Sequence, residues 1–167
     1  MSDLMRLLCV CSVILGPLGL VGCGDDQPER PASQGSSKAA AITFALHEEN
    51  HSGYNGKASL EPSEATASVP GGAKRDGMRV TITISPDTGA GNPAHIHDVT
   101  CAQYRAMGSF DEQLATVEDG LSALDHGRSE TVITTEPTAR TNGHYSINVH
   151  KPAHPYEVIA CGDIPRR

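Results

Sequence analysis

Apolar and polar residues alternate along several short stretches of the chain beyond residue 41. In residues 78–85, Met, Val and Ile side chains alternate with Arg, Thr and Ser side chains. Such a period of two is typical of a β-strand with one buried face. Turn-forming residues separate these stretches. The expected strands cover residues 42–46, 57–61, 63–69, 78–85, 94–98, 129–135, 144–150 and 157–161, with Pro62 ending the second.

Seven or eight short strands between turn signals predict an all-β fold, an antiparallel Greek-key sandwich or barrel. Residues 109–118 contain helix-compatible side chains, but Gly108 and Gly120 on either side favour a loop. No stretch has the length and periodicity of a helix that could form a core. The length of 167 residues fits one domain, which we expect over residues 41–167.

The N-terminal region has the pattern of a bacterial secretory signal. Arg6 precedes an apolar run over residues 7–21. The tetrapeptide Leu-Val-Gly-Cys that ends at Cys23 resembles a lipobox, which implies cleavage before Cys23 and acylation of its thiol. The apolar run is too short for a transmembrane helix, which needs about 20 residues. We therefore expect residues 1–22 to be a signal peptide.

Residues 23–40 are expected to connect the lipid to the domain. They are rich in Gly, Pro, Ser and Gln and lack apolar periodicity, which is typical of a flexible tether. The chain has a net charge of −7, and at most two Lys or Arg residues are adjacent. This charge argues against nucleic acid as a partner and against electrostatic binding to anionic lipids. The expected location is the bacterial cell envelope, outside the cytoplasm, with the N-terminal lipid as the membrane contact.

The five cysteines divide into three groups. Cys9 and Cys11 leave with the signal peptide, and Cys23 takes the lipid. Cys101 and Cys161 remain, and an even pair in an oxidising compartment predicts a disulfide bond. Two buried free thiols are the alternative.

Three histidines lie in strand patterns that place them on polar faces. His95 and His97 share one face of an extended strand, while Ile96 faces the other way. In residues 144–150 the alternation places His150 on the polar face. Imidazole suits copper, and three ring nitrogens can hold Cu(I), or Cu(II) with a further ligand or water. Zinc also accepts three histidines and a water, and surface histidines without a metal are a further alternative.

Residues near these histidines are candidates for supporting roles. His154 follows His150 across a loop that contains proline, and it is either a fourth ligand or a solvated loop histidine. Asp98 and Asn148 are candidates to form hydrogen bonds with the ring N–H groups of the ligands.

The order of these motifs resembles the copper/zinc superoxide dismutase family over most of the predicted domain. In that family a His-x-His pair and a later Val-His pair supply copper ligands, and the corresponding residues here are His95, His97 and His150. The family also joins a cysteine after His-x-His to one in a terminal Ala-Cys-Gly motif, which matches Cys101 and Cys161. The resemblance implies a copper cofactor and dismutation of superoxide to dioxygen and peroxide.

The sequence departs from that family at three places. No histidine lies between Cys101 and Val117, so the family's zinc ligands have no counterparts and zinc is not supported. The charged loop that guides superoxide in the family is reduced to residues 151–156. Val158 stands where the family has an active-site arginine, which removes a contact for an anion.

A second resemblance is to chordin-type domains. They carry a similar Ala-His-Ile-His segment, as at residues 94–97, and a similar late strand, as at residues 145–150. Enzymatic activity is not implied for such domains. The sequence therefore leaves two hypotheses about function. One is a lipid-anchored, copper-dependent superoxide dismutase, and the other is a non-enzymatic module that binds copper or, like a chordin-type domain, acts without a metal.

Overall fold

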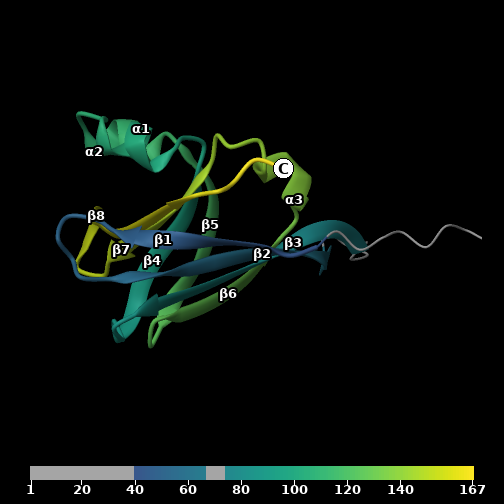
Figure 1. Cartoon of the computed structure of the whole chain (residues 1–167), viewed down its shortest axis with the longest axis horizontal. Helices are drawn as coiled ribbons and strands as arrows, with labels where there is room; N and C mark the ends of the chain where they lie inside the picture. Colours follow the sequence, from purple (N-terminus) through teal and green to yellow (C-terminus); the bar gives the residue numbers. More distant parts are fainter. Residues whose placement is uncertain (1–39, 67–73) are drawn as a thin grey trace, which may run out of the picture. The chain divides into compact units, whose positions relative to one another are not determined.

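The computed structural model describes residues 40–66 and 74–167, and these residues form eight strands and three short helices (Figure 1). The strands are β1 (Ile42–Glu48), β2 (Asn55–Thr66), β3 (Lys74–Ser85), β4 (Ala90–His97), β5 (Val117–Asp125), β6 (Arg128–Ile133), β7 (Ser146–Lys151) and β8 (His154–Asp163). The helices are α1 (Cys101–Arg105), α2 (Phe110–Leu114) and α3 (Pro137–Arg140). The expected signal peptide over residues 1–22, the lipidated Cys23, the tether up to residue 39 and the glycine-rich break near residue 71 lie outside the described residues.

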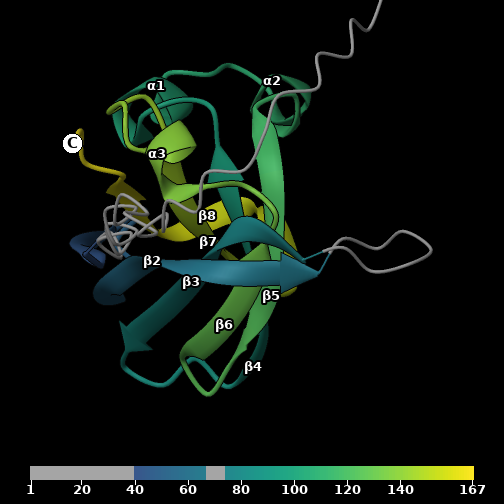
Figure 2. The same ribbon diagram turned by 90° about the vertical axis from the view of Figure 1, so that its right-hand side faces the viewer.

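The strands form a closed antiparallel barrel. Their order around the barrel is β1-β2-β3-β6-β5-β4-β7-β8, and β8 pairs back with β1. Strands β4, β5 and β6 are neighbours in chain order, with α1 and α2 between β4 and β5, and β7 returns to lie beside β4, which is a Greek-key arrangement (Figure 2). The predicted all-β class is confirmed.

The core of this barrel consists of the apolar side chains that alternate with polar ones along the strands. Met78, Val80, Ile82 and Ile84 of β3 are all buried and belong to one apolar cluster, as the alternation predicts. Each such side chain contributes about 1.5–3 kcal/mol through burial. The other strands supply further buried members of this cluster, among them Leu46, Leu60, Ile96, Leu124, Ile147, Val149 and Ile159.

The prediction that a strand ends at Pro62 is wrong. Strand β2 continues through Pro62, which pairs with Met78 of β3. The residue pairs between β1 and β2 extend only to Leu60 in the described part of the chain. Pro62 therefore lies where β2 has a partner on one side, and a proline, which lacks an N–H donor, is tolerated at such an edge. The separate strand expected from residue 63 is the second half of β2, and its predicted last residues, 67–69, lie outside the described residues.

The prediction of a loop over residues 109–118 is wrong, because these residues contain α2 and the start of β5, and α1 precedes them. Helix α1 begins with a capping box, because the Thr100 side chain accepts from the Gln103 N–H and the Gln103 side chain accepts from the Thr100 N–H. At the start of α2 the Ser109 side chain accepts from the Glu112 N–H. The next strand, β5, is mostly exposed or half-buried, so its apolar pattern is weak. In the two described ranges, no helix has the length and apolar character needed to cross a membrane.

Candidate metal centre

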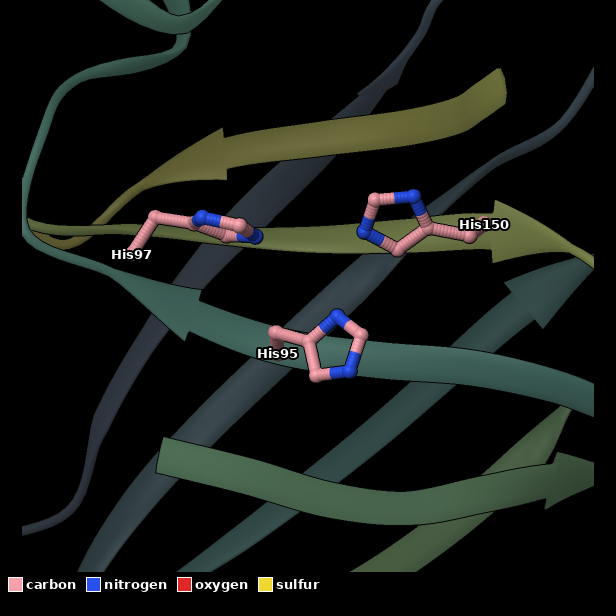
Figure 3. Close-up of side chains that lie close together, drawn as sticks. All are labelled: His95, His97 and His150. Atoms are coloured by element: carbon pink, nitrogen blue, oxygen red, sulfur yellow. The ribbon is translucent and has the colours of Figure 1, made fainter. Parts of the chain in front are cut away.

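The three candidate histidines lie on the outer face of two neighbouring strands. His95 and His97 belong to β4, and Ile96 between them points into the barrel core. Strand β7 pairs with β4 so that Asn148 is opposite His95, and His150 lies two residues further along the same face. Figure 3 shows the three rings converging above the two strands. The predicted placement on a polar strand face is confirmed.

The geometry of the three rings is compatible with one metal ion. The ring centroids are 5.1 Å apart for His95 and His150, 5.8 Å for His95 and His97, and 6.0 Å for His97 and His150. One ring nitrogen from each histidine lies within 4.8 Å of the other two. Ligand nitrogens that share a metal ion at about 2.1 Å lie roughly 3.5 Å apart, so small side-chain rotations would bring the rings to bonding distance.

Most of the ring nitrogens in the cluster have no hydrogen-bond partner. The buried nitrogens without a partner are Nδ1 of His95, Nε2 of His97, and both Nδ1 and Nε2 of His150. Each buried polar atom without a hydrogen bond costs about 1–3 kcal/mol of folding free energy. Four such nitrogens in one cluster therefore need an explanation. A cation between the rings would use one lone pair of each imidazole. The three histidines can therefore hold a metal ion.

The protonation state of His97 follows from its hydrogen bonds. Its Nδ1 atom lies 2.9 Å from Oγ1 of Thr116, and that hydroxyl donates its only proton to the Gln113 carbonyl, 2.7 Å away. Thr116 can therefore only accept from His97, which places the imidazole proton on Nδ1. The lone pair is left on Nε2, the unpartnered atom that faces the cluster. Thr116 thus orients His97 in the way that outer hydrogen bonds orient metal ligands.

Burial keeps the cluster neutral. Burial, together with the repulsion that neighbouring positive rings would exert, lowers the pKa of His150 to about 3 and that of His97 to about 4. The pKa of His95 is also lowered by burial. Neutral imidazoles are the form that binds metal ions.

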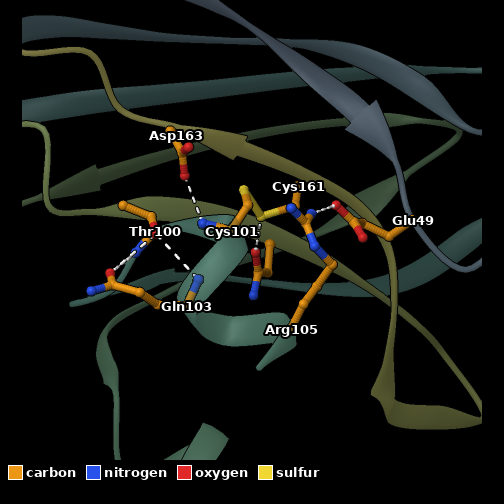
Figure 4. The surroundings of a disulfide bond; sticks show 8 residues. Glu49, Thr100, Cys101, Gln103, Arg105, Cys161 and Asp163 are labelled. Carbon is orange, nitrogen blue, oxygen red and sulfur yellow. Dashed lines mark hydrogen bonds and ion pairs between the residues drawn. A yellow bond between two sulfur atoms is a disulfide. The ribbon is translucent and has the colours of Figure 1, made fainter. Parts of the chain in front are cut away.

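Helix α1 covers part of the histidine cluster with the side chain of Tyr104. The Tyr104 ring packs edge-on against His97, with 4.7 Å between the ring centroids, and lies 6.4 Å from His150. The Cys101–Cys161 disulfide attaches this helix to β8, and the Cys101 N–H donates to the Asp163 carboxylate at 2.6 Å (Figure 4). The predicted disulfide is therefore present, and it fits an oxidising, extracytoplasmic location.

Several predicted supporting residues lie elsewhere. His154 is exposed at the start of β8, where its Nδ1 lies 2.9 Å from the Tyr156 hydroxyl, and it is not part of the three-histidine group. Asp98 pairs with His144 at 3.4 Å and does not contact a ring of the cluster through any hydrogen bond that the structure shows. Asn148 lies beside His95 on β7, and its Nδ2 atom is buried without a partner. The expected partner role therefore belongs to Thr116 and not to Asp98.

Sequence reasoning missed Thr116 and Tyr104. The signal for Tyr104 was the capping pattern of Thr100 and Gln103, which starts a helix directly after the histidine strand. No local signal marks Thr116, because its contact with His97 depends on how residues 98–116 return to β4. Val158, at the position where the resemblance implies an arginine, is buried beside the disulfide.

Comparisons with known proteins give no relative for this chain. No protein-family model, no curated protein and no solved structure matches it. The features that indicate a function are therefore the residues of the histidine cluster and their surroundings.

Proposed function

We propose that this protein binds one copper ion through His95, His97 and His150 and dismutates superoxide outside the cytoplasm. The observation that carries the proposal is the convergence of three neutral imidazoles, each of which has at least one buried ring nitrogen without a hydrogen-bond partner. The resemblance of the histidine and cysteine motifs to copper/zinc superoxide dismutases supports the same assignment.

The donor set favours copper. Three imidazole nitrogens suit Cu(I) in a trigonal set and Cu(II) when a water completes the coordination. The carboxylates of the described residues do not join the group, so hard cations such as Mg²⁺ or Ca²⁺ would find no oxygen ligand there. Zinc accepts the same ligands, so a competition titration between copper and zinc is needed to establish which metal the site prefers.

Turnover of superoxide needs both a redox metal and access to it. Bound copper would supply the electron transfers that convert two superoxide ions and two protons into dioxygen and hydrogen peroxide. The protein supplies ligand geometry through Thr116 and partial exposure through His95, which is less buried than the other two ligands. A diatomic substrate could approach the centre on the His95 side.

A non-catalytic copper-holding module is the second candidate. Tyr104 covers two of the three rings, and the buried Val158 offers no positive charge for an anion. Both features favour retention of a metal over exchange of a substrate. The two candidates share the metal site and differ only in turnover.

The proposal includes attachment to a membrane of the cell envelope through a lipid on Cys23. Support comes from the signal-like N-terminus, from the lipobox-like tetrapeptide and from the disulfide, which fits an oxidising compartment.

The test of the proposed function is copper binding by the purified protein. We expect one Cu(II) per chain, with nitrogen hyperfine structure in its EPR spectrum, and preference over Zn²⁺ in a competition titration. His97→Ala should weaken copper binding about 100-fold or more, because it removes a ligand. His144→Ala is the matched control, since His144 is exposed and outside the cluster. Equal binding by the parent and His97→Ala would refute the site, and a superoxide assay on the loaded protein then separates the enzyme from the copper holder.

Thr116→Val should weaken copper binding about 10-fold without removing a ligand. The substitution deletes the acceptor of the His97 Nδ1–H bond and leaves the ring free to rotate or to move its proton to Nε2. Thr116→Ser restores the hydroxyl and should restore affinity. Competition against a chelator of known affinity measures both variants, and equal affinity in Thr116→Val would show that the hydrogen bond does not orient the ligand.

A further inference from the structure

A cavity of about 230 Å³ lies beside the disulfide and is lined in part by Tyr104. Its lining includes Tyr104, Val158 and the Cys101–Cys161 bridge. None of the three histidines lines it, although Tyr104 contacts His97 directly. The Tyr104 ring therefore separates this cavity from His97, and Val158, which also lines the cavity and pairs with His150 across β7 and β8, lies beside it. The volume equals that of several water molecules at about 30 Å³ each, so the cavity can admit a molecule of several heavy atoms.

Tyr104 is held in this position from both ends. Its backbone belongs to α1, which the disulfide and the Cys101–Asp163 hydrogen bond attach to β8. Its hydroxyl donates to Oε1 of Gln113 at 3.3 Å. Gln113 also accepts, through its carbonyl, the bond from the Thr116 hydroxyl that orients His97. Gln113 therefore helps to fix both Tyr104 and, through Thr116, His97.

The other side of the cluster is open. Gly120 of β5 is directly opposite His95 of β4, so the two residues share one face of the sheet. A Cβ atom added at Gly120 would meet no atom within 4 Å, and Gly120 is exposed. His95 is the partly exposed member of the cluster. Space beside His95 is therefore available to a small molecule.

We propose that Tyr104 is a barrier between the cavity and the histidine cluster, and that small ligands reach a metal bound there along the open flank beside His95 and Gly120. This inference deepens the proposed function and rests on it only for the consequence at the metal. Larger copper ligands such as thiols or imidazoles that enter the cavity are kept from the metal by the ring. Tyr104 is in this sense a specificity-determining residue that favours ligands of two or three atoms.

The barrier can be tested without any metal. Diethyl pyrocarbonate modifies unprotonated imidazoles, and peptide mass spectrometry gives a rate for each histidine. In the metal-free protein at pH 7, His97 and His150 should react at least about 10-fold more slowly than the exposed His144. Tyr104→Ala should raise the rates at His97 and His150 about 10-fold or more and leave His144 unchanged, because only the covered rings gain access. Tyr104→Phe keeps the ring and should react like the parent.

A second substitution at Tyr104 keeps the test decisive if Tyr104→Ala does not fold. Tyr104→Leu keeps an apolar side chain over His97 but removes the ring, and it should give intermediate rates. Gly120→Val fills the open flank and should slow the reaction of His95 alone. The disulfide, checked by mass, and an unchanged His144 rate identify folded samples. Unchanged rates at His97 and His150 in folded Tyr104→Ala and Tyr104→Leu would overturn the barrier.

The consequence at the metal has its own measurement. In copper-loaded protein, Tyr104→Ala should increase the affinity for imidazole, followed by EPR, about 10-fold, while the affinity for azide should change little. An equal imidazole affinity in the parent and the variant would contradict the specificity role. A parent that binds no copper would instead refute the proposed function, while the reaction rates of the metal-free protein would still decide whether Tyr104 is a barrier.

Discussion

Reduction of the Cys101–Cys161 disulfide is expected to lower the free energy of unfolding by about 4 kcal/mol. The two cysteines are 60 residues apart in the sequence, and the bridge restricts the unfolded chain by closing that loop. Urea denaturation of the protein with and without a reductant measures the difference. The double variant Cys101→Ala/Cys161→Ala should be insensitive to the reductant, which makes it the control.

The same reduction should loosen the cover over the histidines. Helix α1 has five residues and cannot be stable without tertiary contacts. Cys101 is its first residue, and the bridge therefore fixes the point from which Tyr104 extends over His97. A difference in the free energy of unfolding below about 1 kcal/mol between the oxidised and reduced protein would contradict the predicted loss of stability. It would mean that other contacts already restrict the loop in the unfolded chain.

The strands could be predicted because their signal is local. Alternation in residues 78–85 depends only on neighbouring positions, and β3 follows it residue by residue. The error at Pro62 has a tertiary origin. Whether a proline ends a strand depends on whether both sides of the strand are paired, and the β1–β2 pairing ends at Leu60.

Two of the three candidate ligands could be predicted for the same local reason. Two residues that are two positions apart share a face, so His95 and His97 had to lie together on any strand. The resemblance implied that His150 joins them, but the pairing of β7 with β4 that brings it there could not be predicted from alternation. The sequence could also not show that this polar face is buried, because its cover is a helix of five residues.

The partners of the ligands were beyond local reasoning. Asp98 follows the histidine strand directly and was one of the two candidates, yet its side chain lies beside His144. Thr116 is 19 residues from His97 in the sequence, and it reaches the ring only because α1 and α2 return the chain to β4. Such contacts depend on the path of a whole segment and not on its residue pattern.

Acidification from pH 7 to pH 5 is expected to destabilise the metal-free protein through His97 and His150. Burial holds their pKa values near 4 and 3, below the ordinary value of 6.5 that applies to the unfolded chain. Between these values the unfolded state binds more protons than the folded state. Stability is therefore fully present above pH 6.5 and falls as the pH decreases toward the folded pKa values. At pH 5 the expected loss is about 2 kcal/mol for each ring.

Urea midpoints of the metal-free protein at pH 7 and pH 5 measure this loss, and a variant isolates the histidine contribution from that of the carboxylates. His150→Gln removes one titrating ring and should reduce the pH dependence by about half of the histidine part. His126→Gln is the control of opposite sign. Its hydrogen bond to Asp87 raises the pKa of His126, so this group stabilises the fold at low pH and loses that effect as the pH rises.

The outcome bears on the metal centre as well as on stability. A pH dependence in the parent that His150→Gln reduces and His126→Gln does not would show that the cluster is buried in its neutral form. The lone pairs would then be free for a metal without prior loss of protons. If His150→Gln leaves the pH dependence unchanged, the ring is protonated or solvated in the folded protein, and the buried three-histidine arrangement is wrong.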